Sequence, residues 1–363
     1  MVSKHTAAVA YIRELCSLGL TGELLIPALL EALHRVIPSA RNLFDWVSAE
    51  GRIQRYYFEG SIDHDVARLY FDEFHNRREA EAMPRYADVI LGEATIHSAE
   101  ELNHRQFFDS ALYHEIWRPQ RLHYRLEAIV RKSDGKPLGS LVLYRERGDR
   151  VFGRDDEQVL KTLVPYIAHG LQHGREQQIE FDKDQRRAVL VNLDAAGRIV
   201  HLSRDAHKVL LLAHSEISPT SAAQPPVSED FPSLLLLHRQ LSRAADRPDA
   251  NCALTLTNAW GRFDFRAEHM QCVGEASAPL IGVTIQHHRP REVRDLGTMQ
   301  AQHLSVAQRK VCAGLLRNQT HAQIAALLGL SANTVADHVR KIYTKFDVHS
   351  VEQLRAHLEA TGD

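Results

Sequence analysis

The stretch that decides the fold of the C-terminal region is residues 320–346, which read THAQIAALLGLSANTVADHVRKIYTKF. Ile324, Leu327 and Leu328 fall on one face of a helix. Gly329 supplies the flexible backbone that ends this helix, and Ser331 is a good N-cap for another. The apolar residues of the second helix recur at helical spacing and are Val335, Val339, Ile342 and Phe346. The stretch therefore predicts two helices joined by a three-residue turn.

The second helix carries a polar and basic face opposite its apolar stripe. The residues on that face are Asn333, Asp337, Arg340, Lys341 and Thr344. Residues 304–350 hold six lysines and arginines against two aspartates, while the whole chain has a formal net charge of −2. A short helix pair with a basic free face is typical of a reader of the DNA major groove, although a helix, glycine, helix pattern alone also occurs in ordinary helical hairpins. The local charge favours salt-sensitive DNA binding.

The wider sequence resembles the LuxR-type DNA-binding domain over about a sixth of the chain. The matching positions are Leu304-Ser305, Thr320, Ile324-Ala325, Leu328-Gly329-Leu330-Ser331, Thr334-Val335, His338-Val339 and Lys345. This resemblance implies four helices near residues 306–317, 320–328, 332–346 and 351–360. It also implies that the third helix enters the major groove and that the fourth often pairs subunits on DNA.

The resemblance assigns a set of residues to the DNA-binding face. They are Thr320, Ser331, Asn333, Thr334, Ala336, Asp337, His338, Arg340, Lys341, Thr344 and Lys345. The chain departs from the family pattern at Gln308 and Gln323, where Glu is typical, and at Ala336, where Lys is common. The glutamines are expected to keep a cap or polar contact, whereas Ala336 removes a DNA contact. Three roles stay open for Asp337, which are reading a cytosine amino group, pairing with a neighbouring arginine and pairing with Lys341 four residues on.

The composition is that of an ordinary globular protein. The chain has 363 residues, of which 44% are hydrophobic and 25% charged, and this length allows two or three domains. No apolar run approaches a membrane span, and residues 1–30 predict a pair of amphipathic helices rather than a signal peptide, so we expect a cytoplasmic protein. The four cysteines lie far apart in sequence. We expect reduced thiols, with no zinc site, disulfide framework or cofactor.

Residues 5–180 predict an α+β unit. Two hairpins are indicated, one over residues 42–58 and one over residues 124–145, with helices at residues 63–79, 105–116 and 155–181. The runs RLEAIVR from Arg125, GSLVLYR from Gly139 and FGRDDEQVL from Phe152, in this order of elements, resemble a GAF domain. The resemblance implies a module that binds a small molecule or dimerises. We expect the apolar stripe of the closing helix to couple two subunits.

Residues 185–289 predict a second α+β unit. The run AVLVNLDAAGRIVHLS from Ala188 indicates two strands around a glycine turn, and a short helix follows at residues 204–212. Strands at residues 253–258, 262–271 and 280–287 would complete a five-stranded antiparallel sheet. The opening resembles a PAS domain. Residues 215–232 are interpreted as a loop and residues 290–302 as a linker to the DNA-binding unit at residues 303–363.

The sequence of residues 5–180 and of residues 185–289 does not identify a ligand for either unit. Six residues are candidates for lining a pocket in the first unit, and core packing is the alternative role for each of them. They are Trp46, Tyr56, Phe58, Tyr113, Trp117 and Arg125. Six histidines of this unit could suggest a haem or metal site, but none of the six shows the HxxxH or cysteine-partnered spacing that places two ligands on one helix face, and solvated or core histidines are the simpler interpretation. They are His64, His75, His97, His104, His114 and His123.

The sequence predicts a DNA-binding transcription regulator and not an enzyme, since it contains no P-loop, no G-x-S-x-G motif and no His/Glu metal motif. We expect a homodimer on double-stranded DNA whose N-terminal units respond to a small-molecule effector. The alternative is a regulator whose N-terminal units bind other proteins and no metabolite. Contact with RNA polymerase is left open.

Overall fold

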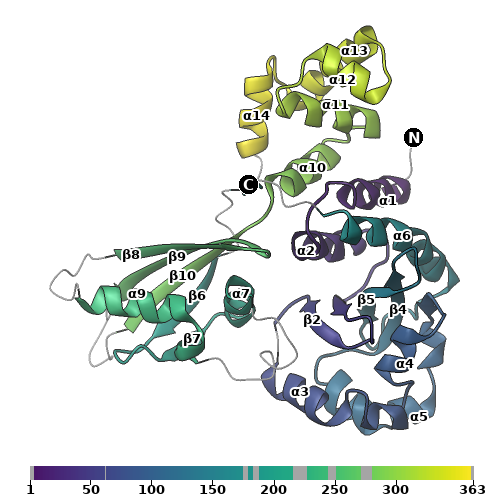
Figure 1. Cartoon of the computed structure of the whole chain (residues 1–363), viewed down its shortest axis with the longest axis vertical. Helices are drawn as coiled ribbons and strands as arrows, with labels where there is room; N and C mark the ends of the chain where they lie inside the picture. The colour runs from purple at the N-terminus through teal and green to yellow at the C-terminus, as the bar shows by residue number, and fades with distance from the viewer. Residues whose placement is uncertain are drawn as a thin grey trace.

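The computed structural model describes residues 4–61, 63–174, 179–182, 188–215, 227–243, 251–270 and 280–360. Two five-stranded antiparallel sheets with their helices lie below a C-terminal helical unit (Figure 1). The mixture of helix and antiparallel sheet confirms the α+β class predicted from the sequence. Within the described ranges, every helix falls short of the length or apolar character that crossing a membrane requires.

The first sheet contains both predicted hairpins. Its strands are β1 (Arg41–Val47), β2 (Ile53–Phe58), β3 (Ile96–His97), β4 (Tyr124–Arg131) and β5 (Pro137–Arg145), in the order β2-β1-β5-β4-β3. Gly51 and Gly135 adopt positive φ angles in the two hairpin turns, which favours glycine at both places. Successive side chains of a strand point to opposite faces, so Phe44 and Asp45 lie on opposite sides of this sheet.

One face of the first sheet is covered by two layers of helices (Figure 1). Helices α2 (Gly22–Leu33) and α6 (Arg154–Gln172) pack on the strands, and α1 (Lys4–Leu15) packs across both helices. Leu160, Leu163 and Ile167 of α6 are buried in this core. The apolar stripe that we expected to couple two subunits is therefore used largely within the chain. The helix also ends at Gln172, and residues 175–178 of the predicted helix lie outside the described residues.

The other face of the first sheet is covered by short helical segments. They are α3 (His64–Leu69), η1 (Tyr70–Phe74), η2 (Arg78–Glu81), α4 (Tyr86–Leu91), η3 (Ala99–Glu101), α5 (Arg105–Phe108) and η4 (Leu112–Trp117). The helix predicted at residues 63–79 runs from α3 through η1 and breaks after Phe74, and the helix predicted at residues 105–116 is divided into α5 and η4. The first breaks because the buried carboxylate of Glu79 accepts hydrogen bonds from the backbone N–H groups of Asn76 and Tyr86, at 2.8 and 2.7 Å.

The second sheet repeats the topology of the first. Its strands are β6 (Ala188–Leu193), β7 (Ile199–Leu202), β8 (Asn251–Asn258), β9 (Gly261–Met270) and β10 (Leu280–His288), in the order β7-β6-β10-β9-β8. Helix α7 (Ala206–Ala213), the short segment η5 (Ser228–Asp230) and helix α9 (Pro232–Arg243) accompany the sheet. Helix α9 was not predicted. Residues 216–226 of the expected loop lie outside the described residues.

The two sheet units pack against each other through aromatic side chains. The ring of Trp260, in the turn before β9, lies 5.7 Å from that of Trp46 and 6.0 Å from that of Tyr57. Lys208 of α7 donates a hydrogen bond to the backbone oxygen of Phe58 at 2.8 Å. These contacts make one continuous core of the two units.

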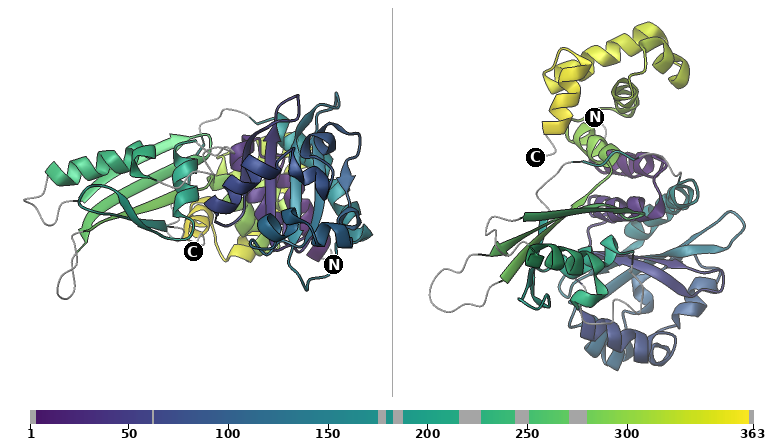
Figure 2. Two further views of the ribbon diagram at one scale, coloured as in Figure 1. Left: turned by 90° about the horizontal axis from the view of Figure 1, so that it is seen from below. Right: turned by 60° about the vertical axis from the view of Figure 1, so that its left-hand side comes forward.

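The segment interpreted as a linker is largely a helix, α10 (Arg291–Ala301). Val293 and Leu296 are buried in the core of the sheet units, whereas Met299 is buried in the core of the C-terminal helices. Helix α10 contacts α1 on one side and the first helix of the C-terminal unit on the other. It thus carries the helical unit above the sheet units, as Figure 2 shows in its right panel.

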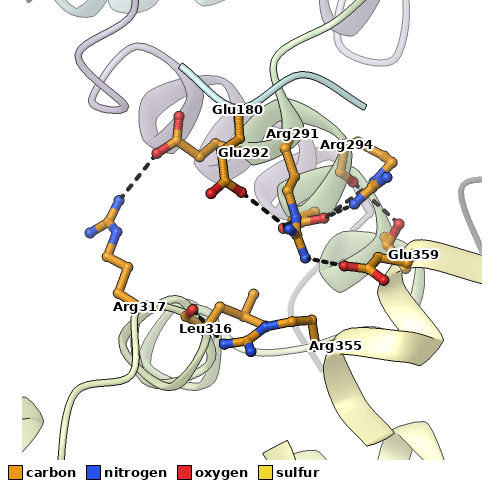
Figure 3. A network of polar contacts seen from close by, with 10 residues as sticks. Glu180, Arg291, Glu292, Arg294, Leu316, Arg317, Arg355 and Glu359 are labelled. Carbon is orange, nitrogen blue, oxygen red and sulfur yellow. Dashed lines mark hydrogen bonds and ion pairs between the residues drawn. The ribbon is translucent and has the colours of Figure 1, made fainter. Parts of the chain in front are cut away.

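A buried arginine ties the C-terminal unit to α1. The side chain of Arg309 is 5% exposed, and its Nε and Nη2 atoms each donate to a carboxylate oxygen of Glu14 at 2.7 Å. Its Nη1 atom donates to Gln300 and to the backbone oxygen of Leu304. A second network joins α10 to the end of the chain, because Arg291 pairs with Glu180 and Glu359 (Figure 3). The C-terminal unit is therefore held by charged contacts to α1, through Glu14, and to α10, through Arg291.

We predict that Glu14→Gln destabilises the folded chain by about 2 kcal/mol, because a buried guanidinium loses its charged partner. The midpoint of urea unfolding, followed by circular dichroism, measures the change. Asp109→Asn is the control, since it makes the equivalent change in an exposed pair with Arg105 and should leave the midpoint nearly unchanged. Equal shifts for both variants would contradict the anchoring role of Glu14.

Candidate nucleic-acid interface

Four helices form the C-terminal unit within the described residues 304–360. They are α11 (Val306–Leu316), α12 (His321–Leu328), α13 (Ala332–Phe346) and α14 (Val351–Ala360), each within one residue of its predicted bounds. One core holds them together, and it includes Leu304, Val311, Leu315, Ile324, Val335, Val339, Ile342, Phe346, Leu354 and Leu358. The apolar stripe predicted for α13 is thus confirmed as its buried face.

The turn between α12 and α13 forms as the sequence predicts. Gly329 ends α12 in the left-handed conformation, with a φ of 65°, and its N–H donates to the backbone oxygen of Ala325. A β-carbon on Gly329 would meet no atom within 4 Å, so the backbone angle alone favours glycine here. Ser331 caps α13, because its hydroxyl accepts from the N–H of Thr334 at 3.1 Å.

The two glutamines that depart from the family pattern complete capping boxes. The carboxamide oxygen of Gln308 accepts from the backbone N–H of Ser305 at 2.9 Å, and that of Gln323 accepts from the N–H of Thr320 at 2.8 Å. Glutamine therefore serves here as a capping partner, as expected. The hydroxyl of Thr320 accepts in return from the N–H of Gln323, so this predicted DNA-face residue begins α12.

The outer face of α13 presents a continuous polar strip to solvent. Its members are exposed and recur along one side of the helix, and they are Asn333, Asp337, Arg340, Lys341 and Thr344. Thr334, Ala336 and His338, also predicted for the DNA face, are half-buried at the edge of this strip. The apolar side of α13 packs in the core of the C-terminal unit and fixes the position of the helix. The polar strip on the opposite side stays exposed and available to a ligand.

Within the described residues, Asp337 forms an ion pair with a neighbouring arginine, Arg340, and not with Lys341. The carboxylate lies 3.3 Å from Nη1 of Arg340, and the side chains are 59% and 78% exposed. An exposed pair of this kind contributes little to stability, so Arg340 can exchange Asp337 for a phosphate oxygen at small cost. Both side chains of the pair are exposed on the outer face of α13.

Two of the six bases counted from the sequence act inside the fold. Arg309 is buried against Glu14. Lys345 donates to the backbone oxygen of His303 at 2.7 Å and to Gln308 at 3.0 Å, which ties the end of α13 to the start of α11. Lys345 was predicted to face DNA, but its ammonium is engaged in these contacts. Lys310, Arg317, Arg340 and Lys341 are exposed, and Lys345 is exposed as well despite its contacts within the fold.

Residues 302–358 match the family model described as bacterial regulatory proteins, luxR family. These residues are a LuxR-type DNA-binding domain. Together with the geometry of α12 and α13, this match shows a helix-turn-helix unit with α13 as its second helix. No curated protein matches the chain in sequence.

Three solved structures resemble larger parts of the chain. The phage VqmA–DPO complex is 14% identical over 49% of this chain and 85% of its own, with a TM-score of 0.21. The VqmA–ligand–DNA complex from Vibrio cholerae is 14% identical over the same shares, with a TM-score of 0.23. The E. coli DhaR(N)–DhaL complex is 14% identical over 77% of this chain and 89% of its own, with a TM-score of 0.25. At such low scores, the LuxR assignment rests on the family model and the helix geometry.

A second candidate site is a cavity of about 150 Å³ between the first sheet and the short helical segments. Tyr56, Phe58, Trp117 and Arg125 line it, which brings together four of the six residues predicted for a pocket. Trp46 does not line it, because the neighbouring Asp45 faces the cavity and Trp46 packs on the opposite side of the sheet. Tyr113 packs in the core beside the cavity, with its hydroxyl 2.7 Å from Nδ1 of His123.

The cavity is lined by charged residues that the sequence interpretation missed. Asp45, Glu79 and Glu127 line it with Arg125. Burial raises the pKa of Asp45 to about 8, helped by the charge of Glu127 and opposed by a hydrogen bond from Tyr86. A signal for these residues was present, because Asp45 interrupts an otherwise apolar strand, and Arg125 and Glu127 alternate with apolar residues of β4.

Replacing both Arg340 and Lys341 by alanine should weaken DNA binding by on the order of 2 kcal/mol and flatten its salt dependence, because about two phosphate contacts are lost. Fluorescence anisotropy at several salt concentrations measures the slope. The variant with Arg105 and Lys132 replaced by alanine removes the same charge far from α13 and should retain the wild-type slope. An unchanged slope in the folded Arg340 and Lys341 variant would refute the assignment.

Asp337→Asn should relax discrimination at one base pair per half-site by roughly 1 to 3 kcal/mol if Asp337 accepts from a cytosine amino group. Binding to unrelated DNA should rise slightly, because a negative charge near phosphates is lost. Selection from a random DNA pool compares the two proteins. Asp347→Asn, which removes the same charge at the far end of α13, should keep the wild-type site. An unaltered preferred site for Asp337→Asn would eliminate Asp337 as a base reader.

Proposed function

We propose that this chain is a transcription regulator that binds double-stranded DNA as a homodimer, and that its N-terminal units control this binding in response to a small-molecule effector. The observation that carries the proposal is the exposed polar strip of α13 within a LuxR-type domain. Two copies of α13 would read the two half-sites of one operator from successive turns of the major groove.

We propose further that residues 5–180 form a GAF-like sensory unit and residues 185–289 a PAS-like unit. The shared strand order of the two sheets supports this view, as do helices packed on one face of the first sheet and a cavity on the other. In this proposal the cavity is the effector site, with Tyr56, Phe58, Trp117 and Arg125 in its wall.

A contiguous path of contacts leads from the cavity to the DNA-binding domain. Strand β1 presents Asp45 to the cavity and Phe44 to the helical layer behind the sheet. That layer supports α1, whose residue Glu14 holds Arg309 of α11. An effector that moves β1 would therefore change the position of α11 relative to α1. We propose that this movement shifts the population of dimers that are competent to bind DNA.

The alternative function is regulation through protein partners of the N-terminal units. One observation favours it, which is the exposure of Leu190 and Val200 on neighbouring strands of the second sheet. Isolated apolar side chains are common at protein surfaces, so this observation is weaker than the cavity.

The test is selection of DNA from a random pool by the full-length chain, followed by analytical ultracentrifugation of the complex. We expect one enriched site with two related half-sites, two chains per site, and an affinity that falls steeply with salt. Failure to enrich any sequence would contradict the proposed function. Enrichment of a single half-site bound by one chain would contradict the homodimer.

A further inference from the structure

The cavity beneath the first sheet is built around buried charges that no side chain of the described residues fully satisfies. Glu127 is 2% exposed; its Oε1 accepts from the hydroxyl of Ser140 at 2.5 Å, while its Oε2 lacks a hydrogen bond within the described residues. Arg125 is equally enclosed, and its Nη2 also lacks a partner there. Buried charged atoms are normally hydrogen-bonded, so two open atoms in one cavity wall indicate a missing ligand.

The four carboxylates that line the cavity, Asp45, Asp63, Glu79 and Glu127, are not equivalent. Asp63 caps α3, because its carboxylate accepts from the backbone N–H of Val66 at 3.1 Å. Glu79 is occupied, because it accepts from two backbone N–H groups and from the hydroxyl of Tyr70. Among the residues that the structure describes, Asp45 accepts only a long hydrogen bond of 3.4 Å from the hydroxyl of Tyr86. Asp45 and Glu127 lie close together, because Asp45 stands opposite Ser140 in the sheet and Ser140 donates to Glu127.

The charges that line the cavity indicate whether its ligand is a cation or an anion. Two under-satisfied carboxylates face one guanidinium, and Arg125 lies 3.3 Å from Glu127 without the geometry of a hydrogen bond. A cation between Asp45 and Glu127 would be attracted to both, whereas an anion beside Arg125 would meet two carboxylates. The aromatic walls, which include Tyr56, Tyr70, Phe71 and Trp117, also suit an organic cation.

We propose that this cavity binds a small organic ammonium ion, whose nitrogen lies between Asp45 and Glu127 and whose polar group accepts a hydrogen bond from Arg125. The cavity of about 150 Å³ has the volume that admits a molecule of about the size of benzene. As the identity of an effector, this inference rests on the proposed function. The binding of an ammonium ion in the cavity does not depend on the proposed function, because it is inferred from the side chains of the cavity alone.

The test uses the full-length chain and four probes in isothermal titration calorimetry. Benzylamine and ethanolamine are the ammonium probes, while benzyl alcohol and benzoate keep the benzyl or phenyl group without the positive charge. We expect an ammonium probe to bind, with benzylamine at least about tenfold tighter than benzyl alcohol and benzoate weakest, since the cation alone satisfies the carboxylates. Benzyl alcohol or benzoate binding as tightly as benzylamine, or no binding by either ammonium probe, would overturn the proposal.

Binding should also depend on pH with a definite sign. The pKa of Asp45 is about 8 in the free protein, and a bound ammonium would lower it, so binding at pH 7 releases a proton. The affinity for benzylamine should therefore rise by up to about tenfold per pH unit from pH 6 toward pH 8. The other titratable and charged groups that line the cavity with Asp45 are Tyr56 of β2, Asp63 at the start of α3, Tyr70 of η1, Glu79 of η2, Tyr86 of α4, Arg125 and Glu127 of β4, and Tyr144 of β5. Burial raises the pKa of all four tyrosines, which keeps them neutral in this range. An affinity that falls or stays constant with rising pH would count against the Asp45 contact.

Glu127→Gln keeps the shape and the Ser140 contact but removes the charge, and it should abolish the preference for benzylamine over benzyl alcohol. Glu115→Gln is the matched control, because Glu115 is exposed on η4, which also lines the cavity. A preference that survives Glu127→Gln would overturn the proposed site. If the variant does not fold, the probe and pH series on the wild-type chain decide the question.

DNA affinity, measured in the same samples, separates this inference from the proposed function. Benzylamine binding without any change in DNA affinity would uphold the cavity and contradict effector control. Sequence-specific DNA binding with no ammonium binding would contradict the cavity proposal and leave the DNA-binding function standing.

Discussion

The buried guanidinium of Arg309 sets the position of the DNA-binding domain on the rest of the chain. A charged side chain that is 5% exposed needs partners at every donor, and Glu14, Gln300 and Leu304 supply them from α1, from α10 and from the start of the domain. These partners come from segments nearly three hundred residues apart. Helix α1 is therefore part of the surface on which the DNA-binding domain packs.

The junction formed by α1, α10 and α11 links the core of the sheet units to the core of the C-terminal helices. Helix α10 buries Val293 and Leu296 in the core of the sheet units and Met299 in the core of the C-terminal helices. Lys345 adds a bond from the end of α13 to the junction between α10 and α11. The orientation of α13 consequently depends on α1 and α10 as well as on its own domain.

The sequence predicts best where the deciding interactions are local. Ser305, Thr320, Ser331 and Gly329 fix the ends of the C-terminal helices through contacts within a few residues, so their bounds follow from the residues themselves. Hairpin turns at Gly51 and Gly135 are equally local.

Tertiary contacts decide the features that the sequence did not predict. The helix expected at residues 63–79 breaks after Phe74, because the fold buries Glu79 and its carboxylate there accepts from the backbone N–H groups of Asn76 and Tyr86. Lys345 and Arg309 have the composition of DNA-contacting bases, yet each is engaged by partners far away in sequence. Strand alternation could have predicted that Trp46 and Asp45 lie on opposite faces of the sheet. It could not predict which of the two faces borders the cavity, because this depends on the strands and helices that pack around β1.

The central claim is that the exposed strip of α13 contacts DNA, and site-specific photo-crosslinking tests it most directly. A crosslinker placed at Asn333 or Lys341 of the full-length chain should react with a selected DNA site, whereas one at the exposed Leu236 of α9 should not. Crosslinks from Leu236, with none from Asn333 or Lys341, would contradict this account.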